Sequence, residues 1–274
     1  MVVQHNLRAM NSNRMLGVTA NQQSKSTEKL SSGYKINRAA DDAAGLAISE
    51  KMRKQVRGLT KAVANAQDGI SCVQTAEGAL AEVHDMLQRM NELAMQSANG
   101  TNSSVDRGYL DKEVQQLKTE INRIANTVTF NDQNLLNGSF KNKNLQVGFS
   151  DDDKISLTIS SLKLSDLDIS KLSISTDALA SAAVKTDSGT ISKSIQKISE
   201  MRSELGAIQN RLEHTVNNLN NVVENTTAAE SQIRDTDMAT EMVKYSNNNI
   251  LAQAGTAMLA QSNQANQNVL SLLG

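Results

Sequence analysis

The chain has 274 residues, enough for one or two domains, but aromatic side chains make up only 2% of it, and Trp and Pro are absent. Aliphatic residues mixed with much Asn, Gln, Ser and Thr favour long helices packed side by side over an aromatic-filled globule. The 28 basic and 29 acidic residues give a net charge of −1, which argues against binding to nucleic acid or to an anionic membrane.

The first 32 residues predict a helix that is polar around most of its circumference, with sparse apolar side chains such as Leu7 and Leu16. A helix with so narrow an apolar stripe is marginal in water without a partner. The opening residues lack the apolar run of a signal-peptide core, and no later segment approaches the roughly 20 apolar residues of a membrane-spanning helix. If the protein leaves the cell, we expect it to do so without the general secretory signal.

A heptad pattern then predicts one long helix from about residue 44 to residue 98. Apolar positions alternate four and three residues apart from Met52 to Val73 and continue to Ala94, as in the seam of a coiled coil. At a rise of 1.5 Å per residue this helix would be about 80 Å long, too long for a compact domain. A loop at 100–104 offers a cap for a second helix at about 105–127, and so short a connection predicts an antiparallel neighbour.

Residues 145–149 and 155–159 alternate apolar and polar side chains across an acidic turn, which predicts a β-hairpin. We expect the stretch from there to about residue 187 to loop back with little regular structure, and it is too short for a further domain. The three-four alternation returns at about 188–226 and predicts a third long helix. Residues 236–274 predict a last helix, polar like the first, with apolar points that include Ile250 and Leu259.

Several ordered motifs resemble those of the bacterial flagellin family. The segment LSSGYKINRAADDAAG at 30–45 resembles the signature that joins the innermost filament domain to the next one. Further matches are NAQDGI at 65–70, LQRMNELA at 87–94, QNRLE at 209–213 and ILAQAG at 250–255. The resemblance covers about residues 1–140 and 191–274. Departures are small, since Asp132 stands where relatives often carry Gly, and Gly274 ends a chain that often ends in Arg.

The resemblance implies a mostly α fold, with long antiparallel coiled-coil-like helices, one small β-hairpin region, and the two termini paired in an inner helical domain. The implied boundaries are residues 1–43 and 233–274 for the inner domain, and residues 44–187 and 188–232 for the second domain, the latter range being its returning helix. The outer domains of larger flagellins are expected to be missing.

The resemblance also implies roles for individual residues. Assembly of the filament core is expected of Leu7, Leu16, Ile250, Leu259, Leu270, Leu272 and Leu273. The joint between the domains is expected at Gly33, Asn37, Asp41, Asp42 and Gly45.

A third set matches positions at which flagellins are recognised by the innate receptor Toll-like receptor 5, namely Gln88, Arg89, Leu93 and Glu113. Arg89 and Leu93 share a helix face at their four-residue spacing, and an exposed Arg beside a Leu anchor suits a binding hot spot. An ordinary ion pair on a solvated face is the alternative interpretation.

The titratable residues predict neither a catalytic nor a metal site. Asp41 and Asp42 lie just ahead of a predicted helix, where acids cap free N–H groups and favour the positive end of the helix dipole. Cys72 lacks the cationic neighbours that would lower its pKa, so an inert packed thiol is expected. Metal ligation is not expected of the histidines, which lie on separate predicted helices without ligand spacing: His5, His84 and His214. We therefore predict no enzymatic activity and no cofactor.

The resemblance predicts a structural subunit that polymerises into the bacterial flagellar filament for swimming motility, and whose termini fold on assembly. It implies an extracellular protein, exported by the flagellar type III system without a cleaved signal peptide. The implied partners are further copies of the chain, a secretion chaperone at the C-terminal segment, the hook-associated junction and cap proteins, and host Toll-like receptor 5. Two alternatives stay open: the hook–filament junction protein, and a soluble coiled-coil export adaptor.

Overall fold

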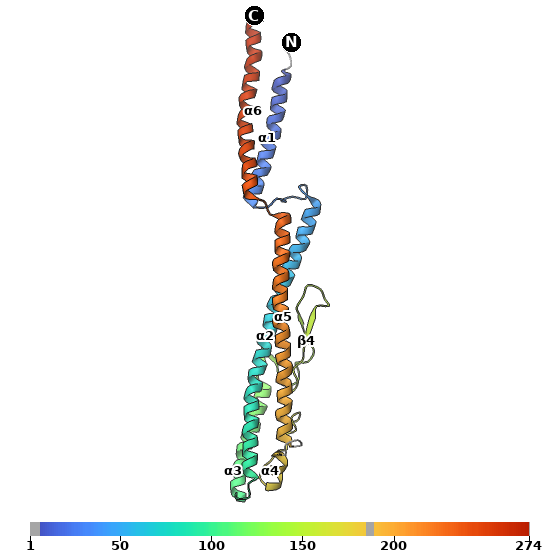
Figure 1. Cartoon of the computed structure of the whole chain (residues 1–274), viewed down its shortest axis with the longest axis vertical. Coiled ribbons are helices and arrows are strands. Elements are labelled where there is room, and N and C mark those ends of the chain that lie inside the picture. Colours follow the sequence, from blue (N-terminus) through green and yellow to red (C-terminus); the bar gives the residue numbers. More distant parts are fainter. Residues whose placement is uncertain (1–5, 185–188, 274) are drawn as a thin grey trace. The chain divides into compact units, whose positions relative to one another are not determined.

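The computed structural model describes residues 6–184 and 189–273, and for residues 266–273 it describes the helical backbone but not the side chains. The described chain is mostly helical, as the sequence predicts (Figure 1). Its helices are α1 (Leu7–Ser32), α2 (Ala43–Ser97), α3 (Ser104–Thr127), α4 (Asp177–Val184), α5 (Thr190–Arg234) and α6 (Met238–Leu273). Its strands are β1 (Thr129–Phe130), β2 (Gln133–Asn134), β3 (Lys143–Gln146) and β4 (Lys154–Leu157).

The long helices lie where the heptad pattern predicts them, and α2 and α3 begin and end within one residue of the expected positions. The helix α3 starts at a capping box, in which the Ser103 hydroxyl accepts the Asp106 N–H and the Asp106 carboxylate accepts the Ser103 N–H. The helix α5 continues to Arg234 instead of ending near Thr226. The added residues contain good helix formers and neither Gly nor Pro, so nothing stops the helix there.

The chain divides into two compact units. The first contains the described residues up to Val56 together with those from Glu224 onward, and the second spans Arg57–Val223. The boundaries expected near residues 43 and 232 therefore lie inside the first unit, because α2 and α5 each have residues in both units.

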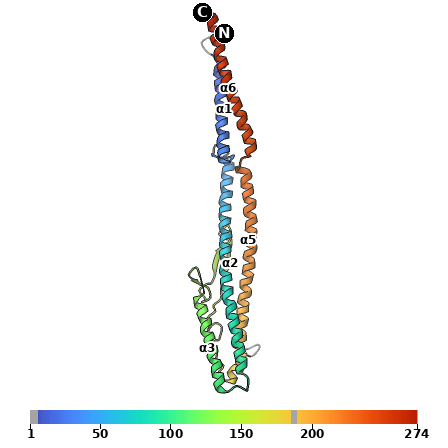
Figure 2. The same ribbon diagram turned by 90° about the vertical axis from the view of Figure 1, so that its left-hand side faces the viewer.

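In the first unit, α1 and α6 lie side by side in opposite directions (Figures 1 and 2). At one end of the pair the Asn6 side chain donates to the Ser262 carbonyl oxygen at 3.2 Å. Towards the other end the Ser26 hydroxyl donates to Glu241 at 2.7 Å. The expected pairing of the N- and C-terminal segments is therefore confirmed.

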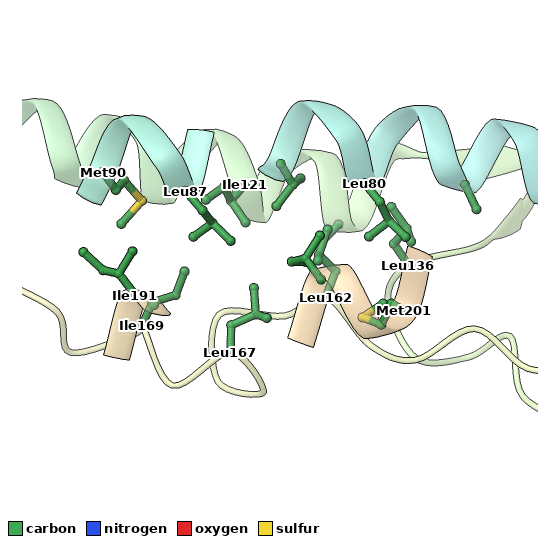
Figure 3. Packing of buried hydrophobic residues seen from close by; sticks show 14 of the residues in the cluster. Leu80, Leu87, Met90, Ile121, Leu136, Leu162, Leu167, Ile169, Ile191 and Met201 are labelled. Carbon is green, nitrogen blue, oxygen red and sulfur yellow. The ribbon is translucent and has the colours of Figure 1, made fainter. Parts of the chain in front are cut away.

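The second unit packs α2 between α3 and α5. Ion pairs link α2 to both neighbours. Arg89 of α2 pairs with Glu113 of α3 at 3.0 Å, and Glu77 of α2 pairs with Arg202 of α5 at 3.6 Å. The side chains between the helices form a large apolar core (Figure 3), separate from two smaller apolar clusters of the same unit. Its largest fully buried members are Leu80, Leu87, Met90, Leu93, Ile121, Leu135, Leu136, Leu157, Ile159, Leu162, Leu167 and Ile169.

The predicted β-hairpin exists, but its strands are shifted. The strands β3 and β4 pair in antiparallel fashion with Leu145 opposite Ile155, whereas the alternating pattern continues to residues 149 and 159. On the turn side the pairing ends at Gln146 and Lys154, because Asp153 closes the turn, its carboxylate accepting the Ser150 N–H at 3.2 Å. A second small pair, β1 with β2, was not predicted, and its loop residues Asn131 and Asp132 both have positive φ.

The expectation of little regular structure before residue 187 is wrong at Asp177–Val184, which forms α4. The irregular stretch ahead of α4 is also buried, since Leu167, Ile169 and Ile174 belong to the core. Buried polar side chains of α3 supply the hydrogen bonds that this backbone needs. Lys118 donates to two of its carbonyl oxygens, those of Ser170 at 2.9 Å and Leu172 at 3.0 Å. Such long-range partners leave no local sequence pattern.

Candidate functional site

The facing sides of α1 and α6 form a regular contact, which we call the terminal seam. Its residues are buried or half-buried, and they recur three and four positions apart along each helix, as in a coiled coil. On α1 they are Ala9, Ser12, Leu16, Thr19, Gln23, Ser26 and Leu30. On α6 they are Glu241, Tyr245, Asn248, Ala252, Gly255, Leu259 and Ser262.

The terminal seam is unusually polar for a helix interface. Ser26 and Glu241 are the buried side chains of α1 and α6 within the described residues, and none of the buried hydrophobic side chains there belongs to either helix. Leu16, Leu30 and Leu259 are only half-buried. The pair therefore removes little apolar surface from water to offset the conformational entropy lost on ordering two long helices.

Large apolar side chains of both helices instead face outward. Leu7 is 68% exposed and Ile250 is 61% exposed. We call these residues the exposed apolar set: Leu7, Met10, Met15, Val18, Met238, Met242, Val243, Ile250, Leu251 and Met258. Exposed apolar side chains gathered in one region of a protein are typical of surfaces that bind other proteins.

The structure separates the predicted assembly residues into two groups. Leu16 and Leu259 lie half-buried in the terminal seam, whereas Leu7 and Ile250 belong to the exposed apolar set. The remaining predicted residues lie in the last turns of α6, outside the described side chains: Leu270, Leu272 and Leu273.

The buried carboxylate of Glu241 is fully engaged. One oxygen accepts the Ser26 hydroxyl at 2.7 Å and the other pairs with Lys244 at 3.4 Å. Burial acts to raise the pKa of Glu241, but the hydrogen bonds from Ser26 and Lys244 and the charges of Lys244 and Lys29 outweigh it and lower that pKa. Glu241 therefore stays ionised at neutral pH.

The predicted joint residues form the turns between α1 and α2. Gly33 ends α1 in the left-handed conformation with φ 76°, and its N–H bonds to the Lys29 carbonyl. The Asp41 carboxylate accepts the Arg38 and Asn37 N–H groups, and these backbone hydrogen bonds lower the Asp41 pKa.

The next carboxylate caps α2, because Asp42 accepts the Gly45 N–H at 2.9 Å. Gly45 leaves room for this cap, since a Cβ would lie 2.5 Å from the Asp42 carboxylate and 2.8 Å from Ile36, and both side chains would have to shift. The capping interpretation of Asp42 is confirmed, whereas the joint role itself stays a prediction.

Three residues of this region escaped the sequence analysis. The Arg234 guanidinium lies over the Tyr34 ring, 4.6 Å from its centroid, and pairs with Glu50 at 2.8 Å. Main-chain hydrogen bonds reinforce the contact, from Lys35 N–H to the Arg234 carbonyl and from Thr236 N–H to the Gly33 carbonyl. The partners lie about two hundred positions apart in the sequence, so no local spacing predicts this contact. Only the expected pairing of the two termini, which brings the connection after α1 close to the connection before α6, could have indicated it.

The predicted receptor-binding residues are only partly exposed. The side chain of Arg89 is half exposed and pairs with Glu113 at 3.0 Å and Glu92 at 3.2 Å. Gln88 is also exposed. Leu93, however, is fully buried in the core, so its side chain does not reach the surface beside Arg89. The residue continues the heptad seam of α2, and that side of the helix packs inward.

The remaining titratable candidates show no constellation for chemistry. Cys72 is buried, and burial raises the pKa of its thiol to about 11. His5 lies outside the described residues, while His84 and His214 lie on α2 and α5. Within the described part of the chain, no group of three or more His, Cys, Asp or Glu side chains could hold a metal ion. None of the helices described there combines the length and apolar character needed to cross a membrane.

Comparison with known proteins gives consistent matches over nearly the whole chain. Residues 3–141 match the bacterial flagellin N-terminal helical region, and residues 189–273 match the bacterial flagellin C-terminal helical region. Flagellin of Halalkalibacterium halodurans is 52% identical, and the flagellar filament 31.3 kDa core protein of Treponema maltophilum is 48% identical, each over the full length of both chains.

A solved structure also matches. The crystal structure of Bacillus cereus flagellin is 34% identical with a TM-score of 0.50, covering 57% of this chain and 88% of that one. The two matched sequence regions contain α1, α2, α3, α5 and α6, and the stretch between them holds β3, β4 and α4.

Proposed function

Because the chain belongs to the bacterial flagellin family, whose members are structural subunits of the flagellar filament, we propose that its terminal helices α1 and α6 are the element through which it polymerises. The protein is a filament subunit and not an enzyme. The observation that carries the proposal is the exposed apolar set on a helix pair whose own seam is polar. Neighbouring copies would cover these side chains.

A single exposed side chain offers the sharpest test. Ile250→Asn removes an apolar group that is 61% exposed and makes no core contact, so the helix content of the monomer should not change. Seeded elongation should fall by about tenfold or more if this side chain is buried between subunits. The matched control is Gln253→Asn, an exposed polar position on the same helix. Normal elongation by Ile250→Asn would contradict the proposal.

Truncation tests the same element more severely. Deleting residues 266–274 should leave the helical second unit folded and soluble, because none of its core residues lies in that segment. Polymerisation onto filament fragments should be abolished. Run on the unaltered chain, the same assay separates the rival assignments, since a hook–filament junction protein would form short rings and an export adaptor no polymer. Normal filament growth by the truncated chain would show that the ends of the chain are not needed for polymerisation, against the proposal.

Folding and assembly are coupled in this proposal. Helices with a polar seam cannot offset their ordering entropy alone, so in the free monomer α1 and α6 should be largely disordered. A secretion chaperone that holds the C-terminal segment would keep monomers from assembling inside the cell, and the hook-associated junction and cap proteins would bind the two ends of the polymer. Family membership supports these partners.

The homologues imply a component of the flagellum outside the cell. For the route we propose flagellar type III export of an unfolded chain, without cleavage of a signal peptide. The absence of Pro suits rapid refolding after export, since no slow prolyl isomerisation remains. A mature N-terminus beginning beyond about residue 15, the lower length of a cleaved signal peptide, would contradict this route.

Recognition by Toll-like receptor 5 is a second function that we propose, through a surface of Gln88, Arg89 and Glu113. The half-exposed Arg89 side chain is held in place by two carboxylates and is therefore preorganised for a partner. Arg89→Ala should weaken receptor signalling by more than about tenfold, as for a central Arg hot spot. Arg123→Ala is the matched control, an exposed Arg paired with Glu120 on α3. Equal signalling by both variants would leave only the ion-pair interpretation.

A further inference from the structure

The terminal seam contains one contact unlike the others. Ser26 is 5% exposed and Glu241 is 6% exposed, and their side chains hydrogen-bond to each other at 2.7 Å across 215 positions of sequence. The second carboxylate oxygen is engaged by Lys244. A buried ion with all of its partners in place is stable only in the one arrangement that supplies them.

The other residues of the terminal seam do little to fix how α1 aligns lengthwise with α6. Its other positions are mostly Ala, Gly, Ser, Thr, Asn and Gln, which have small volumes or adaptable hydrogen bonds and can repack after a slip. In coiled coils a single buried polar contact fixes the register at some cost in stability. If α6 shifted by one helical turn towards the C-terminal end of α1, the Glu241 carboxylate would lie against Leu30 and would lose its Ser26 donor.

We propose that Ser26 and Glu241 are positioning residues that fix the register of α1 against α6, and that the filament requires this register. The inference rests on the proposed role of the terminal helices in polymerisation. It competes with a purely local role, in which Glu241 is an acidic side chain in the first turn of α6 that favours the positive end of the helix dipole.

The register can be read directly with a disulfide. A Cβ built on Gly255 would lie 3.9 Å from the Leu16 Cβ, within the range that disulfides span. Leu16→Cys with Gly255→Cys therefore reports the native register, and Leu16→Cys with Leu259→Cys reports a slip of one turn. Both pairs are placed in a Cys72→Ala background and oxidised with diamide in assembled filaments. Non-reducing electrophoresis separates disulfides within one chain from those between chains.

Three single variants and one double variant then distinguish register from local helix stability. Ser26→Ala and Glu241→Ala should each lower the native-register disulfide by about fivefold and slow seeded elongation by about tenfold, with a matching rise of the slipped disulfide. Glu241→Gln removes the charge but keeps an acceptor for Ser26, and it should stay within about twofold of the unaltered protein. The Ser26→Ala/Glu241→Ala double variant should be no worse than either single variant, because both remove one interaction.

Controls keep the possible failures apart. Ser24→Ala, an exposed position on the same helix, should change neither readout, and circular dichroism should show the second unit intact in every variant. If Glu241→Gln behaves like Glu241→Ala, the dipole explanation holds and the inference is overturned. The inference is also overturned if all variants elongate and cross-link like the unaltered chain, although the proposed function then survives. If the unaltered chain does not polymerise, the proposed function fails and this inference fails with it.

Discussion

Burial alters the chemistry of the one thiol in the chain. Burial raises the pKa of Cys72 to about 11, so at pH 8 almost no thiolate is present, and the sulfur is also shielded from reagents. Labelling by a disulfide reagent should be at least about a hundredfold slower in the native protein than in denaturant. Ser71→Cys in a Cys72→Ala background supplies an exposed thiol one position away as the control. Equally fast labelling of both thiols would show that the α2 core opens locally.

The charge of Glu241 predicts a pH dependence for the terminal seam. The pKa of Glu241 is lowered from 4.5 in the folded pair, so its ionised form stabilises pairing above that pH, and this stabilisation is lost as the pH falls through the lowered value. The groups that face it are Ser26 and Lys29 on α1 and Lys244 on α6.

Filament stability relative to Glu241→Gln isolates this contribution. Other lowered carboxylates, such as Asp41 and Asp237, are common to both proteins. The ratio of the variant's critical concentration to that of the unaltered protein should fall as the pH drops below about 4.5. A ratio that is constant between pH 6 and pH 3 would contradict the assignment of this linkage to Glu241.

At the residue scale, the sequence predicted what is local. The helix cap at Asp42 followed from an acid placed before an apolar heptad, and its carboxylate does accept the Gly45 N–H. The Ser26–Glu241 contact joins residues from opposite ends of the chain, so no local spacing indicates it. The burial of Leu93 in the core follows from tertiary packing, which the match to the receptor-binding positions does not indicate.

Among the elements, the hairpin of β1 and β2 has a strained backbone turn, and one substitution should relieve that strain. Asn131 has φ 48° and Asp132 has φ 60°, the left-handed pair of a two-residue turn that favours Asn-Gly. Asp132→Gly should stabilise the second unit by up to about 1 kcal/mol, since relief of the left-handed penalty exceeds the added entropy of Gly. Asp152→Gly, at an exposed position without positive φ, is the control. A lower urea midpoint for Asp132→Gly would show that the aspartate side chain stabilises the turn.

The long helices could be predicted from periodicity alone, and the small elements could not. The heptads of α2 and α5 repeat over many turns, so their signal survives individual polar interruptions. The helix α4 has only eight residues, and the irregular stretch before it is ordered by Lys118 and Asp111 of α3. Burial lowers the pKa of Lys118, although the Asp111 charge opposes the shift. Such support depends on tertiary packing that sequence spacing does not encode.

For the whole molecule, the two units present different surfaces for different tasks. The second unit has an apolar core built from α2, α3, α4 and α5, a hairpin and the irregular stretch before α4, and it can be stable alone. In the first unit, α1 and α6 have a polar seam and an outward apolar set, so their stability depends on what covers them. This division of apolar side chains is the physical basis for coupling folding to assembly.

Amide hydrogen exchange on the monomer and on the filament tests that coupling most directly. In the monomer, amides of α1 and α6 should exchange with protection factors below about 10, while core amides of α2, α3 and α5 in the second unit are protected by the global stability. In the filament, protection of α1 and α6 should rise by at least about a hundredfold. Strong protection of both terminal helices in the free monomer, or no gain on polymerisation, would contradict the account.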